Sequence, residues 1–135
     1  MIGYHKSVLV KEVLDALNVQ KGKWYLDGTL GDGGHSLEIL KRGGKVVGID
    51  QDPDALVRAK TRFDQERIDH ELYRLVEVNF SKVTDLVDQT KFEGIILDLG
   101  VSSFQLETPQ RGFSFQANAS LDMRMSPKLA VRAQD

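Results

Sequence analysis

The feature that most constrains this chain is a loop at residues 28–34 that contains four glycines in seven positions. A short apolar stretch ending in the acid Asp27 precedes the loop, and a run with helical spacing follows it. Glycine permits steep turns and close approach by a ligand, at a cost in conformational entropy. The loop therefore either turns very sharply between a strand and a helix, or is approached closely by a ligand.

Strand and helix patterns alternate on both sides of this loop. The segment "KVVGID" lacks alternation of polar and apolar residues, which is typical of a parallel strand covered on both faces. Each parallel strand needs a crossover, usually a helix, so the alternation predicts an α/β fold with a parallel, doubly wound sheet. The expected strands lie at 23–29, 45–50, 71–80 and 93–101, and the expected helices at 7–19, 35–44, 52–63 and 81–90.

Several helix ends carry their own signals. Asp52 is an N-cap candidate, and Pro53 suits the first helical position that follows it. Ser81 is the expected cap of the helix at 81–90. Asn18 is a stop signal for the first helix, and the pair at 43–44 ends the second with two glycines.

Composition excludes several classes of protein. A length of 135 residues suits one compact domain. The net charge of −2 gives no basic footprint for tight, sequence-blind binding of nucleic acid. The chain has no cysteine, and its three histidines lack the spacing of a metal site, so no metal is expected. No apolar run approaches membrane-spanning length and the start does not resemble a signal peptide, which favours a cytoplasmic protein.

Two classes of cofactor use a glycine loop at the carboxyl ends of parallel strands. Dinucleotides need the spacing G-x-G-x-x-G, and here no glycine stands three residues after Gly33. S-adenosylmethionine carries no phosphate and needs a main chain that passes flat against it, with an acid at the end of the next strand for its ribose hydroxyls. Asp50 supplies such an acid, although both cofactor classes share it. The remaining interpretation is that the glycines only make turns.

Four other candidate residues lie near the loop and the strand ends. His35 begins the helix after the loop and could be satisfied locally. Asp98 ends the fourth strand, where it could face a transferred methyl group or bind nearby backbone N–H groups. Gln105 could reach the same pocket. Phe80 could lie against an adenine or belong to the core.

The pattern of apolar and polar residues changes after Val101. The segment that follows has no strand pattern and only weak helical spacing near its end. It is long for a plain loop in a compact domain. It is expected to be a functional segment or the beginning of a part not included.

Several segments together resemble the MraW family of S-adenosylmethionine-dependent methyltransferases, which methylate the exocyclic N4 of a cytidine in bacterial small-subunit ribosomal RNA. The matching stretches run from His5 to Met125 and include "YLDGTLGDGGHS" and "GIDQDPDAL". The combination of "DLGVSS" with "RGFSF" and "LDMRM" is highly specific. The resemblance implies a Rossmann-like class I methyltransferase whose sheet, as far as this chain goes, has the strand order 3-2-1-4.

The resemblance also implies a set of contacts with S-adenosylmethionine. These are main-chain or side-chain contacts in the glycine loop, an acid for the ribose, an aromatic near the adenine, and two polar residues at and beyond the fourth strand. The catalytic residue stays unassigned. The implied cofactor residues are Gly33, Gly34, His35, Asp50, Phe80, Asp98 and Gln105.

Family members are considerably longer, and they insert a helical substrate-recognition domain after the fourth strand. Residues 1–106 are therefore expected to form the cofactor-binding core, and 107–135 the start of that insertion. The expected partner is small-subunit ribosomal RNA, bound mostly through the missing region, with no membrane partner. If nothing follows Asp135, the fourth strand would present an unpaired apolar edge, which favours self-association. The alternative function is a truncated cofactor-binding half without catalytic activity of its own.

Overall fold

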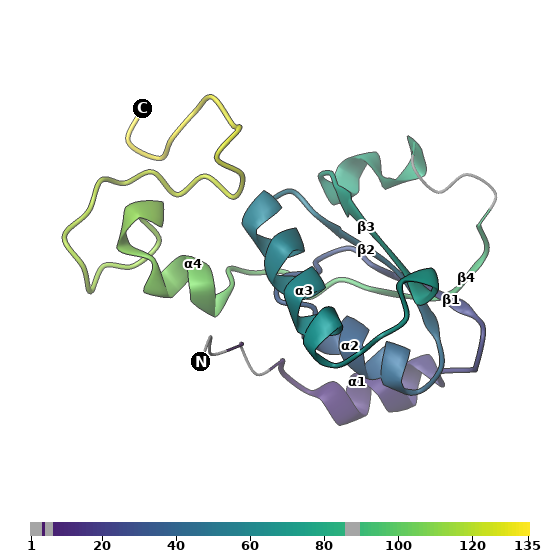
Figure 1. The fold of residues 1–135 in the computed structure, drawn as a ribbon. Helices are drawn as coiled ribbons and strands as arrows, with labels where there is room; N and C mark the ends of the chain where they lie inside the picture. Colours follow the sequence, from purple (N-terminus) through teal and green to yellow (C-terminus); the bar gives the residue numbers. More distant parts are fainter. Residues whose placement is uncertain (1–3, 5–6, 86–89) are drawn as a thin grey trace. The chain divides into compact units, whose positions relative to one another are not determined.

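The computed structural model describes residues 4, 7–85 and 90–135, and its chain divides into two compact units. The first unit, Lys6–Asp98, contains the sheet and the helices that pack on it (Figure 1). The second unit comprises Leu99–Asp135 together with Met1–His5. Among the described residues, no helix is both long enough and apolar enough to cross a membrane.

The sheet has four parallel strands in the order β3-β2-β1-β4, which confirms the predicted fold class and strand order. The central strands β1 and β2 are almost wholly buried, as expected of parallel strands covered on both faces. Strand β4 forms one edge of the sheet, and its Ile95 is 59% exposed. The strands are β1 (Trp24–Asp27), β2 (Lys45–Asp50), β3 (Tyr73–Glu77) and β4 (Phe92–Ile96).

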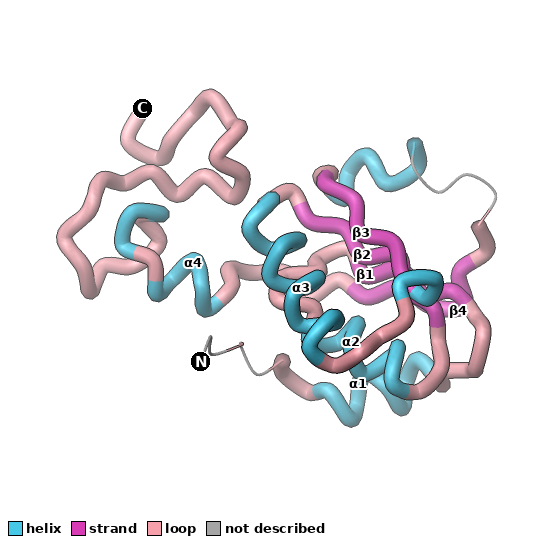
Figure 2. Tube along the Cα trace, viewed as in Figure 1, coloured by secondary structure: helices cyan, strands magenta, loops and turns pink. Residues whose placement is uncertain are grey.

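Three helices lie on one face of the sheet, namely α1 (Val10–Leu17), α2 (Gly34–Lys41) and α3 (Pro53–Gln65) (Figure 2). These three helices confirm the helices predicted at 7–19, 35–44 and 52–63. Their apolar side chains and those of the facing strand residues form the main core. Its fully buried members include Leu14, Tyr25, Leu37, Ile39, Val46 and Phe63.

Helix ends follow the predicted signals in α1 and α3. The Asp52 carboxylate accepts a hydrogen bond from the Asp54 N–H at 3.1 Å, and Pro53 is the first residue of α3. Asn18 ends α1 in the left-handed conformation, with φ of 46°. A short polar side chain tolerates this conformation better than most, which is why asparagine stops a helix.

The other face of the sheet carries a smaller apolar cluster of Leu26, Val47 and Ile49. Val83 of the 3₁₀ helix η2 (Phe80–Asp85) and Phe92 pack against this cluster. Ser81 was predicted to cap a helix here, and that prediction was wrong. The helix starts one residue earlier, and the Asn79 side chain accepts from the Ser81 N–H at 2.9 Å. Positions 86–89 of the predicted helix lie outside the described residues.

The second unit contains a helix that the sequence pattern did not predict, α4 (Ser103–Glu107). A reciprocal pair of hydrogen bonds starts it. The Ser102 hydroxyl accepts from the Gln105 N–H at 3.2 Å, and the Gln105 side-chain oxygen accepts from the Ser102 N–H at 3.0 Å. A helix of five residues is too short to show periodicity, so only this capping box could have indicated it. The weak helical spacing near the end corresponds to turns instead.

Two arginines organise the rest of the second unit. The Arg124 guanidinium binds both carboxylate oxygens of Asp122 at 2.8 Å and lowers the pKa of that carboxyl to about 2. The Arg111 side chain donates to the carbonyl oxygens of Arg124 and Met125, each at 3.1 Å. The segments "RGFSF" and "LDMRM" are therefore joined to each other within this unit.

Candidate functional site

The glycine loop closes over the carboxyl ends of three neighbouring strands. The Leu30 N–H donates to the Ile49 carbonyl at 3.0 Å, and the Gly28 N–H donates to the Ile96 carbonyl at 2.9 Å. The loop is thus joined to Ile49, one residue before the end of β2, and to Ile96, the last residue of β4. This edge is where ligands bind in open parallel sheets.

Asp50 is the acid at this edge. Its Oδ2 accepts from the Gly31 N–H at 2.9 Å, and its Oδ1 accepts from the Asp52 N–H at 2.9 Å. Burial raises the pKa of Asp50 above its usual value, and the backbone N–H groups of Asp52 and Gly31 partly offset that rise. A carboxylate has about four acceptor positions, so Asp50 can accept from a ligand hydroxyl in addition to these groups.

The two adjacent glycines, Gly33 and Gly34, are closely packed by protein side chains. Gly33 has φ of +70°, and a Cβ there would lie 2.8 Å from Phe63 Cε1 and 3.1 Å from the Ala59 Cβ. A Cβ on Gly34 would collide with the Ser7 hydroxyl. Packing against buried residues therefore accounts for the missing side chain at Gly33, while at Gly34 the clash is with the end of a small side chain that can rotate.

Gly31 is different, because its missing side chain faces open space. It has φ of +51°, and the nearest atom to an added Cβ is the Thr29 carbonyl oxygen at 4.0 Å. Its N–H is the group that binds Asp50. Gly31 is therefore the loop position where a ligand has room to approach the main chain, and sequence reasoning did not single it out.

His35 is buried at the start of α2, with 6% of its surface exposed. Its Nε2 lies 2.9 Å from the Val8 carbonyl oxygen, so an Nε2–H donates to that carbonyl. This contact holds the segment before α1 against the start of α2. The structure therefore gives His35 a local hydrogen-bond partner, the Val8 carbonyl.

Asp98 and Phe80 lie beyond the ends of β4 and β3. The Asp98 N–H donates to the Thr29 hydroxyl oxygen at 2.6 Å, which joins the end of β4 to the glycine loop. The Asp98 residue itself is exposed. Phe80 is 42% exposed, so it is not a core residue, and it remains available to a ligand. Gln105 belongs to the second unit, where it is buried and caps α4.

Asp27 is a buried acid in this region to which the sequence reasoning gave no role. It is 2% exposed, and its Oδ2 accepts from the Ser36 hydroxyl at 2.7 Å while its Oδ1 accepts from the Thr29 N–H at 3.1 Å. Burial raises the pKa of Asp27. The Asp27 carboxylate thus connects β1, the glycine loop and α2. The sequence feature that could have indicated this role is an acid directly before the first glycine of the loop.

Asp32 is the second acid that sequence reasoning missed. Its carboxylate forms a bidentate pair with Arg58, with Nε–Oδ1 at 2.8 Å and Nη2–Oδ2 at 2.9 Å. The acid lies inside the glycine loop and the arginine on α3. Its partner could not be identified from spacing alone, because many arginines occur on this chain.

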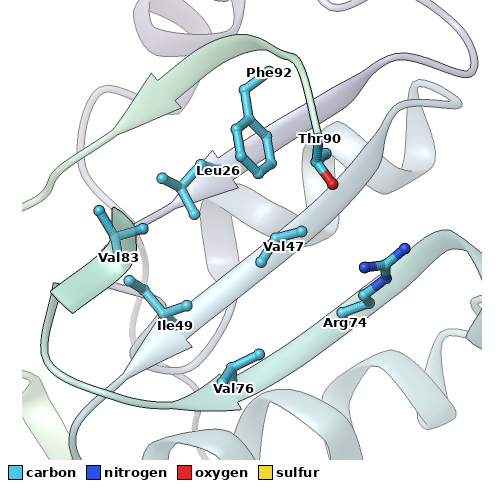
Figure 3. Close-up of a pocket in the computed structure, with 8 residues that line it drawn as sticks. All are labelled: Leu26, Val47, Ile49, Arg74, Val76, Val83, Thr90 and Phe92. Carbon is cyan, nitrogen blue, oxygen red and sulfur yellow. The ribbon is translucent and has the colours of Figure 1, made fainter. Parts of the chain in front are cut away.

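A small cavity lies on the face of the sheet that α1, α2 and α3 do not cover, and it is not the candidate site. It has a volume of about 70 Å³ and a mostly apolar lining (Figure 3). Ligand pockets usually measure about 300–1,000 Å³. The carboxyl edge with its loop and acid remains the candidate site. The lining residues are Leu26, Val47, Ile49, Arg74, Val76, Val83, Thr90 and Phe92.

Solved structures of methyltransferases share this fold. The C-terminal domain of precorrin-6Y C5,15-methyltransferase from Rhodobacter capsulatus superposes with a TM-score of 0.62 at 22% identity, covering 77% of this chain and 55% of that one. An rRNA methylase from Streptococcus thermophilus gives a TM-score of 0.61 at 20% identity, covering 74% of this chain and 57% of that one. Together with the strand order, these similarities show the Rossmann-like fold of methyltransferases.

Sequence comparison identifies the family. The family model described as the MraW methylase family matches residues 3–135, and the chain belongs to this family. A ribosomal RNA small subunit methyltransferase H from Lachnospira eligens is 44% identical over 134 residues, which cover 97% of this chain and 42% of the relative. The protein of the same name from Clostridium botulinum strain Hall is 46% identical over 128 residues, 90% of this chain and 40% of the relative. The chain thus spans less than half the length of these relatives.

Proposed function

We propose that this chain binds S-adenosylmethionine at the carboxyl edge of its sheet and forms the cofactor-binding part of a methyltransferase for small-subunit ribosomal RNA. The observation that carries the proposal is the Asp50 carboxylate held beside the open position Gly31, in a chain of a methylase family. The acid suits the ribose hydroxyls, and the loop needs no phosphate site for this cofactor. The reaction would take place in the cytoplasm, where this RNA is found.

The residues present fit the cofactor at several points. Asp50 would accept from the ribose hydroxyls, and the main chain from Gly31 to His35 would pass alongside the cofactor. The exposed ring of Phe80 would pack against the adenine, and Asp98 would lie near the methionine portion. Gln105 is proposed as a cofactor residue from the family resemblance alone.

The proposed acceptor is the exocyclic N4 of a cytidine. S-adenosylmethionine supplies a methyl group on a positively charged sulfur. The cytosine amine is a poor nucleophile because its lone pair is delocalised into the ring, so an acceptor for its N–H protons would favour the reactive, pyramidal form. Asp98, whose side chain is exposed at the end of β4, or a backbone carbonyl in residues 98–101, would provide that acceptor. The base must leave its stack to reach this edge.

Calorimetry with S-adenosylmethionine tests the binding step. The wild-type chain should bind, and Asp50→Ala should weaken binding by roughly 10- to 150-fold, because a hydrogen bond to a charged group contributes about 1.5–3 kcal/mol. Asp15→Ala is the matched control, since Asp15 is an exposed acid on α1. Equal affinity of the Asp50→Ala and wild-type chains would remove Asp50 from the site.

The second candidate is a cofactor-binding half without catalytic activity of its own. It is favoured by the coverage, since the chain matches only 42% of its relative from Lachnospira eligens. In this proposal residues 107–135 begin a substrate-recognition region, and most RNA contacts lie in the part of the relatives that this chain does not match. Incubation with labelled S-adenosylmethionine and purified small-subunit RNA separates the two candidates. Labelled N4-methylcytidine after digestion supports the full activity, and binding without labelling supports the inactive half.

A further inference from the structure

The ion pair between Arg58 and Asp32 joins the glycine loop to α3 at a protected position. The two side chains are 15% and 5% exposed, and both carboxylate oxygens are engaged, at 2.8 Å and 2.9 Å. Arg62, one turn further along α3, donates to the Asp32 carbonyl oxygen at 3.3 Å. The side chain and the main chain of one loop residue are thus both held by the same helix.

A second connection between the loop and α3 passes through Asp50. The Gly31 N–H donates to one oxygen of this carboxylate, and the Asp52 N–H donates to the other. Asp52 in turn caps α3. Asp32 directly follows Gly31, so fixing its side chain on α3 also fixes the direction of the N–H that binds Asp50.

The loop needs such a restraint because of its glycines. Gly31 and Gly33 both have positive φ, at +51° and +70°, and glycine loses more conformational freedom on ordering than any other residue. A bidentate arginine–carboxylate pair has a fixed planar geometry, so it restrains direction as well as distance. A lysine at position 58 would keep the charge and lose that restraint.

We propose that Arg58 is a positioning residue for the cofactor site. Its bidentate bond to Asp32 holds the glycine loop so that the Gly31 N–H stays on Asp50, and this orients the Asp50 carboxylate toward the cofactor ribose. The inference rests on the proposed function, because it assigns the orientation of Asp50 a role in cofactor binding. Arg58 itself acts through Asp32 and does not touch the cofactor.

Amide hydrogen exchange of the ligand-free chain tests the restraint directly. In Arg58→Lys, exchange at Gly31 should rise at least tenfold relative to the change at Val47 in the centre of β2. Lys60→Ala is the matched control, because it breaks an exposed ion pair with Asp64 on the same helix. Asp32→Asn should give the same local effect from the loop side. Equal changes at Gly31 and Val47 would mean that the pair only stabilises the whole fold, and would overturn the proposal.

Cofactor affinity tests the positioning role. Binding of S-adenosylmethionine, measured well below the unfolding temperature of each variant, should weaken about tenfold in Arg58→Lys and further in Arg58→Gln. Unchanged affinity in Arg58→Lys overturns the positioning role even where exchange at Gly31 has risen. Absence of binding to the wild-type chain overturns the proposed function instead, while unchanged exchange at Gly31 overturns the restraint. Failure of the positioning role, of the restraint and of the proposed function would thus each give a different result.

Discussion

Replacing Gly33 by alanine separates the structural reason for a glycine from the ligand-based one. An added Cβ would lie 2.8 Å and 2.9 Å from two ring carbons of Phe63 and 3.1 Å from the Ala59 Cβ. Phe63 is fully buried and packs edge-on against Tyr73, with ring centroids 5.0 Å apart. Because the ring is fully buried and already in contact with Tyr73, it has little room to move away.

The expected loss of stability has two parts. A side chain in the left-handed conformation costs about 1–2 kcal/mol, which applies because Gly33 has φ of +70°. Overpacking a well-filled core costs typically about 1–3 kcal/mol more. Gly33→Ala should therefore lower the free energy of unfolding by about 2–5 kcal/mol, a large share of the roughly 5–15 kcal/mol that stabilises an ordinary domain.

Urea unfolding followed by circular dichroism measures this loss, and Gly22→Ala provides the matched control. Gly22 has φ of +77°, and an added Cβ would meet nothing within 4 Å. This control should lose only the conformational part, about 1–2 kcal/mol. If both variants lose the same free energy, the packing against Phe63 does not explain the glycine, and the reasoning from these distances fails.

Three further predictions concern the candidate site and the sheet edge. Gly31→Ala should change stability by about 1–2 kcal/mol, from its positive φ alone, but should weaken S-adenosylmethionine binding at least tenfold in calorimetry, because the new methyl group enters the open approach. Binding requires ionised Asp50, and burial raises the pKa of this carboxyl above its ordinary value of 3.8. The affinity for S-adenosylmethionine should therefore be full at neutral pH and should already fall at pH values above 3.8 as the solution is acidified. We propose self-association through the exposed edge strand β4, and Ile95→Lys should reduce it in sedimentation experiments at increasing concentration.

Each of these has a contradicting result. Full affinity in Gly31→Ala would show that the cofactor does not approach the loop there. An affinity that is constant down to pH 4 would mean that the charge on Asp50 does not contribute to binding. A wild-type chain that stays monomeric at high concentration would remove self-association through β4.

The strands and the start of α3 could be predicted because their signals are local, whereas the strand order was implied by the resemblance to the MraW family. Continuous apolar runs mark β1 and β2, and Asp52 followed by Pro53 marks where a helix must begin. Parallel strands then need crossovers, which leaves few topologies. Helix α4 escaped prediction because its start depends on two reciprocal hydrogen bonds between Ser102 and Gln105, and its length does not allow a periodic pattern.

The acid Asp50 was also predictable, since the end of a buried strand is visible in the sequence. The partners of the loop residues were not. Gly33 packs against Phe63 and Asp32 binds Arg58, and in both pairs the partner of the loop residue lies further along the chain, on α3. Such contacts depend on how α3 packs on the sheet, and a single sequence does not contain that information.

The glycines of the loop are needed for different reasons, and only some of them bear on the proposed function. Gly33 is explained by its packing against Phe63 and Ala59, so the lack of a side chain there is no argument for a ligand. The argument for close approach applies to Gly31, which faces open space and binds Asp50 through its N–H. The hydrogen bond from the Gly31 N–H to Asp50 therefore links the loop to the acid in the proposed cofactor site, and whatever disturbs that bond should weaken cofactor binding more than it destabilises the fold.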